Sequence, residues 1–86
     1  MYSIEFSRKA RKQFKALPEL VRDRLIPKID SLTENPRPSD CKALQGTKGL
    51  YRVRVGDYRI LYSIEDRRLF ILIVEIGHRR EIYRDR

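Results

Sequence analysis

The strongest constraint on the fold is a regular alternation of apolar and polar residues on both sides of the dipeptide Gly56-Asp57. Residues 50–55 alternate before the dipeptide and residues 58–64 alternate after it. Alternation with a period of two is typical of a half-buried β-strand, and a two-residue connection that begins with glycine matches a tight hairpin turn. The sequence therefore predicts a β-hairpin whose register is set by this turn.

Two helices are predicted before the hairpin. Ser7 is suited to cap the first helix. The apolar residues of that helix recur on one face: Ala10, Phe14 and Leu17. Pro18 fits the first turn of the second helix. Its apolar residues recur at spacings of three and four: Val21, Leu25, Ile29 and Leu32. The two helices should pack together as a helical hairpin.

The remaining segments complete an α+β fold. Residues 2–6 alternate like a short N-terminal strand, and residues 69–76 are nearly all apolar, as expected of a central strand covered on both faces. The stretch from Asn35 to Gly49 is predicted to be an irregular loop. We expect a single domain over residues 1–86, with antiparallel strands in one sheet, the helical hairpin on one face, and the other face partly open.

The charge balance indicates an anionic partner. Twenty Lys and Arg against twelve Asp and Glu give a net charge of +8, which fits nucleic acid, a ribosome, an acidic protein or a membrane surface. Fourteen of the basic residues are arginines, which favours phosphate, because a guanidinium binds phosphate oxygens in a bidentate way. A lone cysteine, the absence of a long apolar segment and an N-terminus unlike a signal peptide predict a cytoplasmic protein that does not enter a membrane.

The hairpin predicts an arginine-rich surface. Its apolar residues fall on one strand face, so Arg52 and Arg54 fall on the other. If the turn holds only two residues, Arg54 lies directly opposite Arg59. Like charges across a strand pair are destabilising, so this arrangement favours a bound anion, with phosphate as the natural candidate. A merely solvated strand face is the alternative that the pattern leaves open.

The segment after the apolar strand adds functional candidates. It carries His78, Arg79, Arg80, Tyr83 and Arg84, and we expect these side chains to reach the same open face as the hairpin arginines. Guanidinium groups suit phosphate, a tyrosine suits base stacking or proton transfer, and a histidine titrates near neutral pH. Structural roles for the single histidine and the tyrosine remain the alternative.

Several chemistries are disfavoured by the composition. One histidine and one cysteine do not make a zinc site, and the chain has neither a glycine-rich phosphate loop nor a serine-nucleophile motif. The acidic residues are scattered, so no pair of catalytic carboxylates is suggested, and we expect no metal and no cofactor. RNA cleavage by the RNA's own 2′-hydroxyl fits what remains, because it requires only alignment, charge stabilisation and proton transfer.

Two segments, residues 50–62 and 74–83, resemble the RelE branch of the RelE/ParE superfamily of toxins. The resemblance implies a RelE-like fold and the toxin of a type II toxin–antitoxin system. It implies an mRNA interferase, an endoribonuclease that cuts messenger RNA in the ribosomal A site and so inhibits translation. It also implies a cognate antitoxin, which we expect to fold an acidic, partly disordered segment onto the helices or the open sheet face.

The resemblance also implies a set of site residues. The catalytic set is Arg52, Arg54, Arg59, Arg79 and Tyr83, to which we add His78. We expect the first two to position the phosphate, the next two to stabilise the transition state, and His78 or Tyr83 to transfer protons.

Three more basic residues are predicted to bind RNA: Lys48, Arg80 and Arg84. The best-known family members carry lysines where this chain has Arg52 and Arg54, which leaves the general base open, because arginine does not readily give up a proton. The competing interpretations are a ParE-like inhibitor of DNA gyrase without nuclease activity and a non-catalytic RNA-binding protein.

Overall fold

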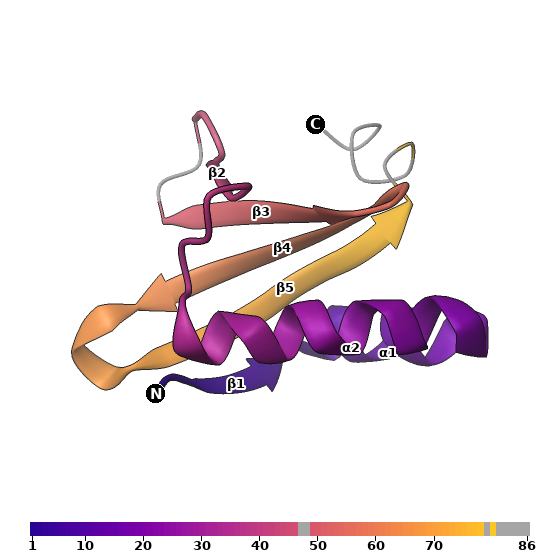
Figure 1. The fold of residues 1–86 in the computed structure, drawn as a ribbon, viewed down its shortest axis with the longest axis horizontal. Helices are drawn as coiled ribbons and strands as arrows, with labels where there is room; N and C mark the ends of the chain where they lie inside the picture. The colour runs from indigo at the N-terminus through magenta and orange to yellow at the C-terminus, as the bar shows by residue number, and fades with distance from the viewer. Residues whose placement is uncertain (47–48, 79, 81–86) are drawn as a thin grey trace.

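The computed structural model describes residues 1–46, 49–78 and 80. Its elements in chain order are β1 (Ser3–Phe6), α1 (Arg8–Ala16), α2 (Glu19–Glu34), β2 (Lys42–Ala43), β3 (Leu50–Val55), β4 (Tyr58–Glu65), the 3₁₀ helix η1 (Asp66–Arg68) and β5 (Phe70–His78). The described strands form one five-stranded sheet in the order β1-β5-β4-β3-β2, and both helices lie on one side of it (Figure 1). The predicted α+β class, with helices on one face of a sheet, is confirmed.

The sheet is mixed. Strands β3, β4 and β5 are antiparallel as predicted, whereas β1 pairs with β5 in parallel. The two helices return the chain to the end of the sheet where β1 begins, so β3 runs in the same direction as β1. Strand β5, which is two antiparallel strands further along the chain, has that direction too. The expectation of an irregular loop up to Gly49 is wrong at Lys42 and Ala43, which form β2 against β3. A two-residue strand is too short to leave a periodic pattern in the sequence.

Helix α1 closes the edge of β5 beyond the point where β1 ends. The Ser7 hydroxyl accepts a hydrogen bond from the Ala10 backbone N–H at 3.0 Å, as predicted for the cap, and donates one to the Val74 carbonyl at 2.8 Å. Nearly two turns after Ser7, the Gln13 side-chain oxygen accepts a hydrogen bond from the Ile76 N–H at 2.7 Å. The backbone groups at this edge of β5 are therefore satisfied by helix side chains in place of a strand.

The turn between the helices is held by Arg22. Its Nη1 donates to the Leu17 carbonyl at 2.8 Å and to the Lys15 carbonyl at 3.2 Å, so a side chain of α2 satisfies carbonyls at the end of α1. Pro18 is the N-cap residue of α2. Neither helix of the described chain is long and apolar enough to cross a membrane.

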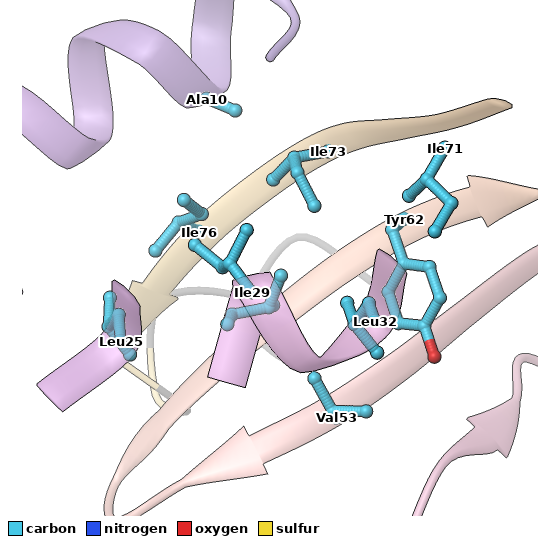
Figure 2. Packing of buried hydrophobic residues seen from close by; sticks show 10 residues of the cluster. Ala10, Leu25, Ile29, Leu32, Val53, Tyr62, Ile71, Ile73 and Ile76 are labelled. Carbon is cyan, nitrogen blue, oxygen red and sulfur yellow. The ribbon is translucent and has the colours of Figure 1, made fainter. Parts of the chain in front are cut away.

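The core lies between the helices and the sheet (Figure 2). Ala10 of α1 and three α2 residues at the predicted spacing of four and three, Leu25, Ile29 and Leu32, point toward the sheet. The sheet residues of the cluster are Val53, Ile60, Tyr62, Ile71, Ile73 and Ile76. Burying each large aliphatic side chain contributes roughly 1.5–3 kcal/mol, so these few residues account for much of the stabilisation of so small a chain.

Strand β5 has the predicted interior place, between β1 and β4. The expectation that both of its faces would be covered is wrong. Ile71 and Ile73 are buried beneath the helices, whereas Phe70, Leu72 and Val74 are only half-buried. One face of the sheet therefore stays partly open, and that face carries the site described next.

Candidate active site

The β3–β4 hairpin has the register that its sequence predicts. Its turn consists of Gly56 and Asp57, and Gly56 adopts a φ of +59°, a conformation that glycine tolerates at no steric cost. This turn places Arg54 directly opposite Arg59 in the antiparallel ladder, and Arg52 opposite Leu61. The three arginines therefore share the sheet face that points away from the helices.

A cavity of about 360 Å³ opens at these arginines. Its lining residues, which we call the arginine pocket, are Asp40, Lys42, Arg52, Val53, Arg54, Gly56 and Arg59. The volume lies in the range of roughly 300–1,000 Å³ that is usual for small-ligand sites. The pocket is therefore large enough to receive a phosphate together with part of the nucleotide that carries it.

The arginine pocket is strongly electropositive. Four cationic side chains line it against the single carboxylate of Asp40. Arg59 is only 7% exposed, and the Nε of Arg54 donates to the Gly56 carbonyl at 3.0 Å, which orients its guanidinium. Such an arrangement of fixed cations in a recess attracts anions and stabilises charge that develops on a bound phosphate.

The segment at the start of β2 contributes two residues that were not predicted as part of the site, Asp40 just before the strand and Lys42 within it. Lys42 stands opposite Arg52 in the short β2–β3 ladder. Asp40 forms an ion pair with Lys28 of α2 at 2.7 Å, and the hydrogen bond from Lys28 holds the pKa of this carboxyl below its usual range. Asp40 therefore stays ionised and anchors the pocket rim to α2. Only a tertiary contact brings this segment to the hairpin, so no periodicity pointed to it.

His78 does not join the arginines. The β4–β5 register places it opposite Tyr58, whose ring packs on the core side of the sheet, and the two rings meet edge to face with centroids 5.6 Å apart. The Nδ1 of His78 accepts a hydrogen bond from the Arg80 backbone N–H at 3.3 Å. The expectation that His78 shares the open face with the hairpin arginines is therefore wrong, and its contacts suit a structural role.

The other predicted C-terminal residues are only partly described. Arg80 is exposed and lies just beyond β5. Lys48, Arg79, Tyr83 and Arg84 lie outside the described residues. The described part of the site therefore consists of the arginine pocket alone, with Arg52, Arg54 and Arg59 as its predicted members.

Comparison with known proteins places the chain in a family. A family model described as the ParE toxin of the type II toxin–antitoxin system parDE matches residues 4–83. The mRNA interferase toxin RelE of Escherichia coli K12 is 27% identical over 86 residues, which cover 95% of this chain and 90% of the relative.

Solved structures agree with this relationship. The intact E. coli RelBE toxin–antitoxin complex contains a chain that matches with a TM-score of 0.81 and 25% identity, covering 91% of this chain and 96% of the other. In the archaeal RelE–RelB complex from Pyrococcus horikoshii, the values are a TM-score of 0.78 and 31% identity, over 91% and 94% of the two chains. The chain therefore belongs to the ParE toxin family of type II toxin–antitoxin systems, and RelE proteins are among its relatives.

Proposed function

We propose that this protein is a toxin that cleaves messenger RNA in the ribosomal A site. The observation that carries the proposal is the direct pairing of Arg54 with Arg59 beside a cavity that also holds Arg52 and Lys42. Two like charges placed opposite each other on neighbouring strands destabilise the fold. A phosphodiester bound in the cavity would instead contact several of these cationic side chains. The relationship to the E. coli mRNA interferase RelE supports the same function.

The proposed reaction uses the RNA's own 2′-hydroxyl and no metal. A base removes the proton from this hydroxyl, its oxygen attacks the adjacent phosphorus, and the bond from phosphorus to the 5′-oxygen of the next nucleotide breaks. A proton transferred to that 5′-oxygen completes the step and leaves a 2′,3′-cyclic phosphate and a 5′-hydroxyl. The negative charge on the phosphate oxygens increases in the transition state, so fixed guanidinium groups stabilise it more than the ground state.

The residues divide between charge stabilisation and proton transfer. Arg52 and Arg54 position the phosphate, and the buried Arg59 stabilises the transition state together with Arg79. Arginine keeps its proton at any physiological pH, so the pocket arginines do not supply the general base. Tyr83 takes that part in the proposal, since His78 packs against Tyr58 on the other side of the sheet. Lys48, Arg80 and Arg84 extend the contact with RNA.

The charge of the whole chain suits both partners of such a toxin. A net charge of +8 favours association with ribosomal and messenger RNA, and it also favours an acidic antitoxin segment. RelE chains in the solved complexes are bound by RelB antitoxins. We propose that a cognate antitoxin, through an acidic segment that orders on binding, silences this protein in the same way.

Inhibition of DNA gyrase is the second candidate, because the matching family model is named for ParE. A gyrase inhibitor needs a binding surface but no cluster of phosphate-stabilising groups. Turnover therefore distinguishes the two functions, whereas salt dependence does not, since any protein that contacts phosphates binds more weakly as salt rises.

The test is primer extension on messenger RNA in a cell-free translation mixture. We expect new 5′ ends within codons when the protein is added, no such ends without ribosomes, and no such ends with the double variant Arg52→Ala/Arg54→Ala. Cuts on free RNA would identify a nuclease that does not need the ribosome. Folded protein that makes no cuts would overturn the proposal, and a supercoiling assay would then test gyrase.

A further inference from the structure

The outer surface of α1 carries a row of cations that the arginine pocket does not use. The apolar side of this helix faces the core: Ala10 is buried, and Phe14 and Leu17 pack against the core cluster. Successive residues of an α-helix are rotated by about 100°, so four basic residues fall on the opposite side of α1, and all four are exposed. We call them the cationic stripe: Arg8, Arg11, Lys12 and Lys15.

The charge pattern of α1 is unfavourable for a helix by itself. Arg8, Lys9 and Arg11 occupy its first turn, which contains no acidic residue, although the N-terminus of a helix carries a partial positive charge. The pairs Arg8–Lys12 and Arg11–Lys15 are spaced by four residues, and like charges at this spacing destabilise a helix. None of the stripe residues forms an ion pair with another described residue. A bound polyanion would offset this repulsion.

The stripe is held in a fixed orientation by contacts on the other sides of α1. The side chains of Ser7 and Gln13 form hydrogen bonds with the β5 backbone at 2.8 and 2.7 Å. The Nζ of Lys9 lies 3.5 Å from a carboxylate oxygen of Glu75, also in β5. These contacts prevent the helix from rotating about its axis, so the four cations point away from the sheet as one preorganised row.

The residues around the stripe disfavour a protein or a membrane as its partner. The large apolar residues that are exposed in the described chain are Met1, Leu20, Ile26 and Leu69, and none of them belongs to α1. Protein interfaces depend on aromatic or apolar anchors at their centre, and a helix that binds a membrane inserts its apolar face, which α1 buries in the core. The stripe therefore offers charge and hydrogen-bond donors alone.

These groups match the backbone of double-stranded RNA. The stripe extends over seven residues, or about 10 Å along the helix axis, which is long enough to contact more than one phosphate of the same strand. Binding of a single strand uses aromatic side chains on which bases stack, and the stripe contains none. A duplex has its bases already stacked and is recognised largely through its phosphates and sugars.

We propose that the cationic stripe of α1 is a second RNA-binding surface, which binds the phosphate backbone of a double-stranded RNA segment. The helices lie on one side of the sheet and the pocket arginines point to the other (Figure 1), so the protein can contact a duplex and a single strand at the same time. The proposal rests on the proposed function only for its effect on cleavage, and duplex binding can be measured without any cleavage.

The first test is fluorescence anisotropy across a salt series with an RNA duplex of about 16 base pairs. We expect the variant Arg8→Gln/Lys12→Gln to bind the duplex with a salt slope smaller by roughly 1.8, since two phosphate contacts are lost. The control Arg24→Gln/Arg67→Gln removes the same charge from α2 and η1 and should keep the wild-type slope. Equal slopes for the stripe variant and the control would overturn the proposal.

Two further variants separate the stripe from the pocket. Arg11→Gln/Lys15→Gln should behave like the first stripe variant and replaces it if that variant does not fold; both remove like-charge pairs and should melt no lower than the wild type. Arg52→Ala/Arg54→Ala should weaken binding of a single strand and keep the duplex slope. A stripe variant that loses binding to phosphatidylserine vesicles or to polyglutamate, with an unchanged duplex slope, would overturn the proposal in favour of a membrane or an acidic protein.

The second test measures cleavage on translating ribosomes. A stripe variant should raise KM at least about threefold and leave kcat within about twofold of the wild type, because the stripe contributes to binding and does not touch the reacting atoms. A lower kcat with an unchanged KM would contradict this role. If the wild type cuts no RNA at all, the proposed function fails, and the duplex titration still decides whether the stripe binds RNA.

Discussion

Arginine is used in opposite ways at the two ends of β4. Asp66 directly follows the last residue of β4. Arg37 donates to both carboxylate oxygens of Asp66, at 2.9 and 3.2 Å, and to the Tyr51 hydroxyl at 3.3 Å. Tyr2 donates to the same carboxylate at 2.6 Å. Near the other end of the strand, Arg59 faces Arg54. We call the first group, Tyr2, Arg37, Tyr51 and Asp66, the Asp66 cluster.

We interpret this difference as one between arginines that stabilise the fold and arginines that, in the proposed function, bind RNA. The Asp66 cluster balances its charges and joins the N-terminus, the loop after α2, β3 and η1 (Figure 1). The arginine pocket concentrates positive charge against one carboxylate. Substitutions in the cluster should therefore reduce stability and preserve cleavage, whereas substitutions in the pocket should reduce cleavage and preserve or increase stability.

Apart from the loss of Arg59, the largest effect is expected from Arg54→Thr. Cleavage should fall roughly a hundredfold or more, since one of the two guanidinium groups that position the phosphate is lost. The free energy of unfolding should rise by about 0.5 kcal/mol, which corresponds to an increase of roughly 2–4 °C in the melting temperature. The increase is expected because the repulsion with Arg59 is removed and because threonine is favoured in strands. The exposed Arg67 offers a control with the same change of charge, Arg67→Thr, in which cleavage and melting should stay as in the wild type. A variant that melts lower and still cuts would contradict the comparison.

A stability effect without a functional one is expected from Tyr62→Phe. The buried Tyr62 hydroxyl donates to the Pro36 carbonyl at 2.8 Å, and burial raises its pKa. Removing the hydroxyl leaves that carbonyl without its donor, so the free energy of unfolding should fall by about 1–2 kcal/mol in urea titration. Cleavage per folded molecule should not change. A loss of cleavage at a temperature where the variant is folded would mean that the core also shapes the site.

A smaller effect is expected from Lys42→Ala, which removes one cation from the rim of the pocket. Affinity for single-stranded RNA, measured by fluorescence anisotropy across a salt series, should depend less on salt, with a slope smaller by roughly 0.7 if Lys42 contacts one phosphate. Arg67→Ala should leave the slope as it is. The same slope in both variants would remove Lys42 from the binding site.

The smallest effect concerns acid stability through Asp66. The hydrogen bonds from Arg37 and Tyr2 hold the pKa of Asp66 below its usual range. A carboxyl whose pKa is lower in the folded state stabilises the protein above its unfolded pKa, near 4, and this stabilisation is lost as the pH falls further. Asp66→Asn should therefore melt below the wild type at pH 7, with a gap that narrows at pH 3. A gap of equal size at both pH values would show that Asp66 acts through shape alone.

Much of the fold and part of the site could be predicted from local patterns. The hairpin register followed from strict alternation around a two-residue glycine turn, and that register alone put Arg54 opposite Arg59. The helix face with Leu25, Ile29 and Leu32 followed from the helical period. These features depend on residues that are close in sequence, so the sequence contains what is needed to find them.

Other features depend on contacts that no local pattern encodes. The nearly all-apolar β5 has no alternation of apolar and polar residues. Val74 has no partner residue in β4, because the β4–β5 register shifts there. The sequence pattern therefore could not show on which face of the sheet His78 lies. Lys42 enters the site through a two-residue strand. Glu75 stands alone among apolar neighbours in the sequence, and only the ladder with β4 shows that it lies opposite Leu61.

The central claim is that the arginine pocket cuts RNA while the Asp66 cluster supports the fold. The most direct measurement compares Arg59→Ala and Arg37→Ala for cleavage on translating ribosomes and for thermal melting, with the folded fraction checked by circular dichroism at the assay temperature. We expect Arg59→Ala to lose about a hundred- to a thousandfold in cleavage rate, and Arg37→Ala to melt lower yet cut within about threefold of the wild type. Cleavage by folded Arg59→Ala at the wild-type rate would contradict the claim.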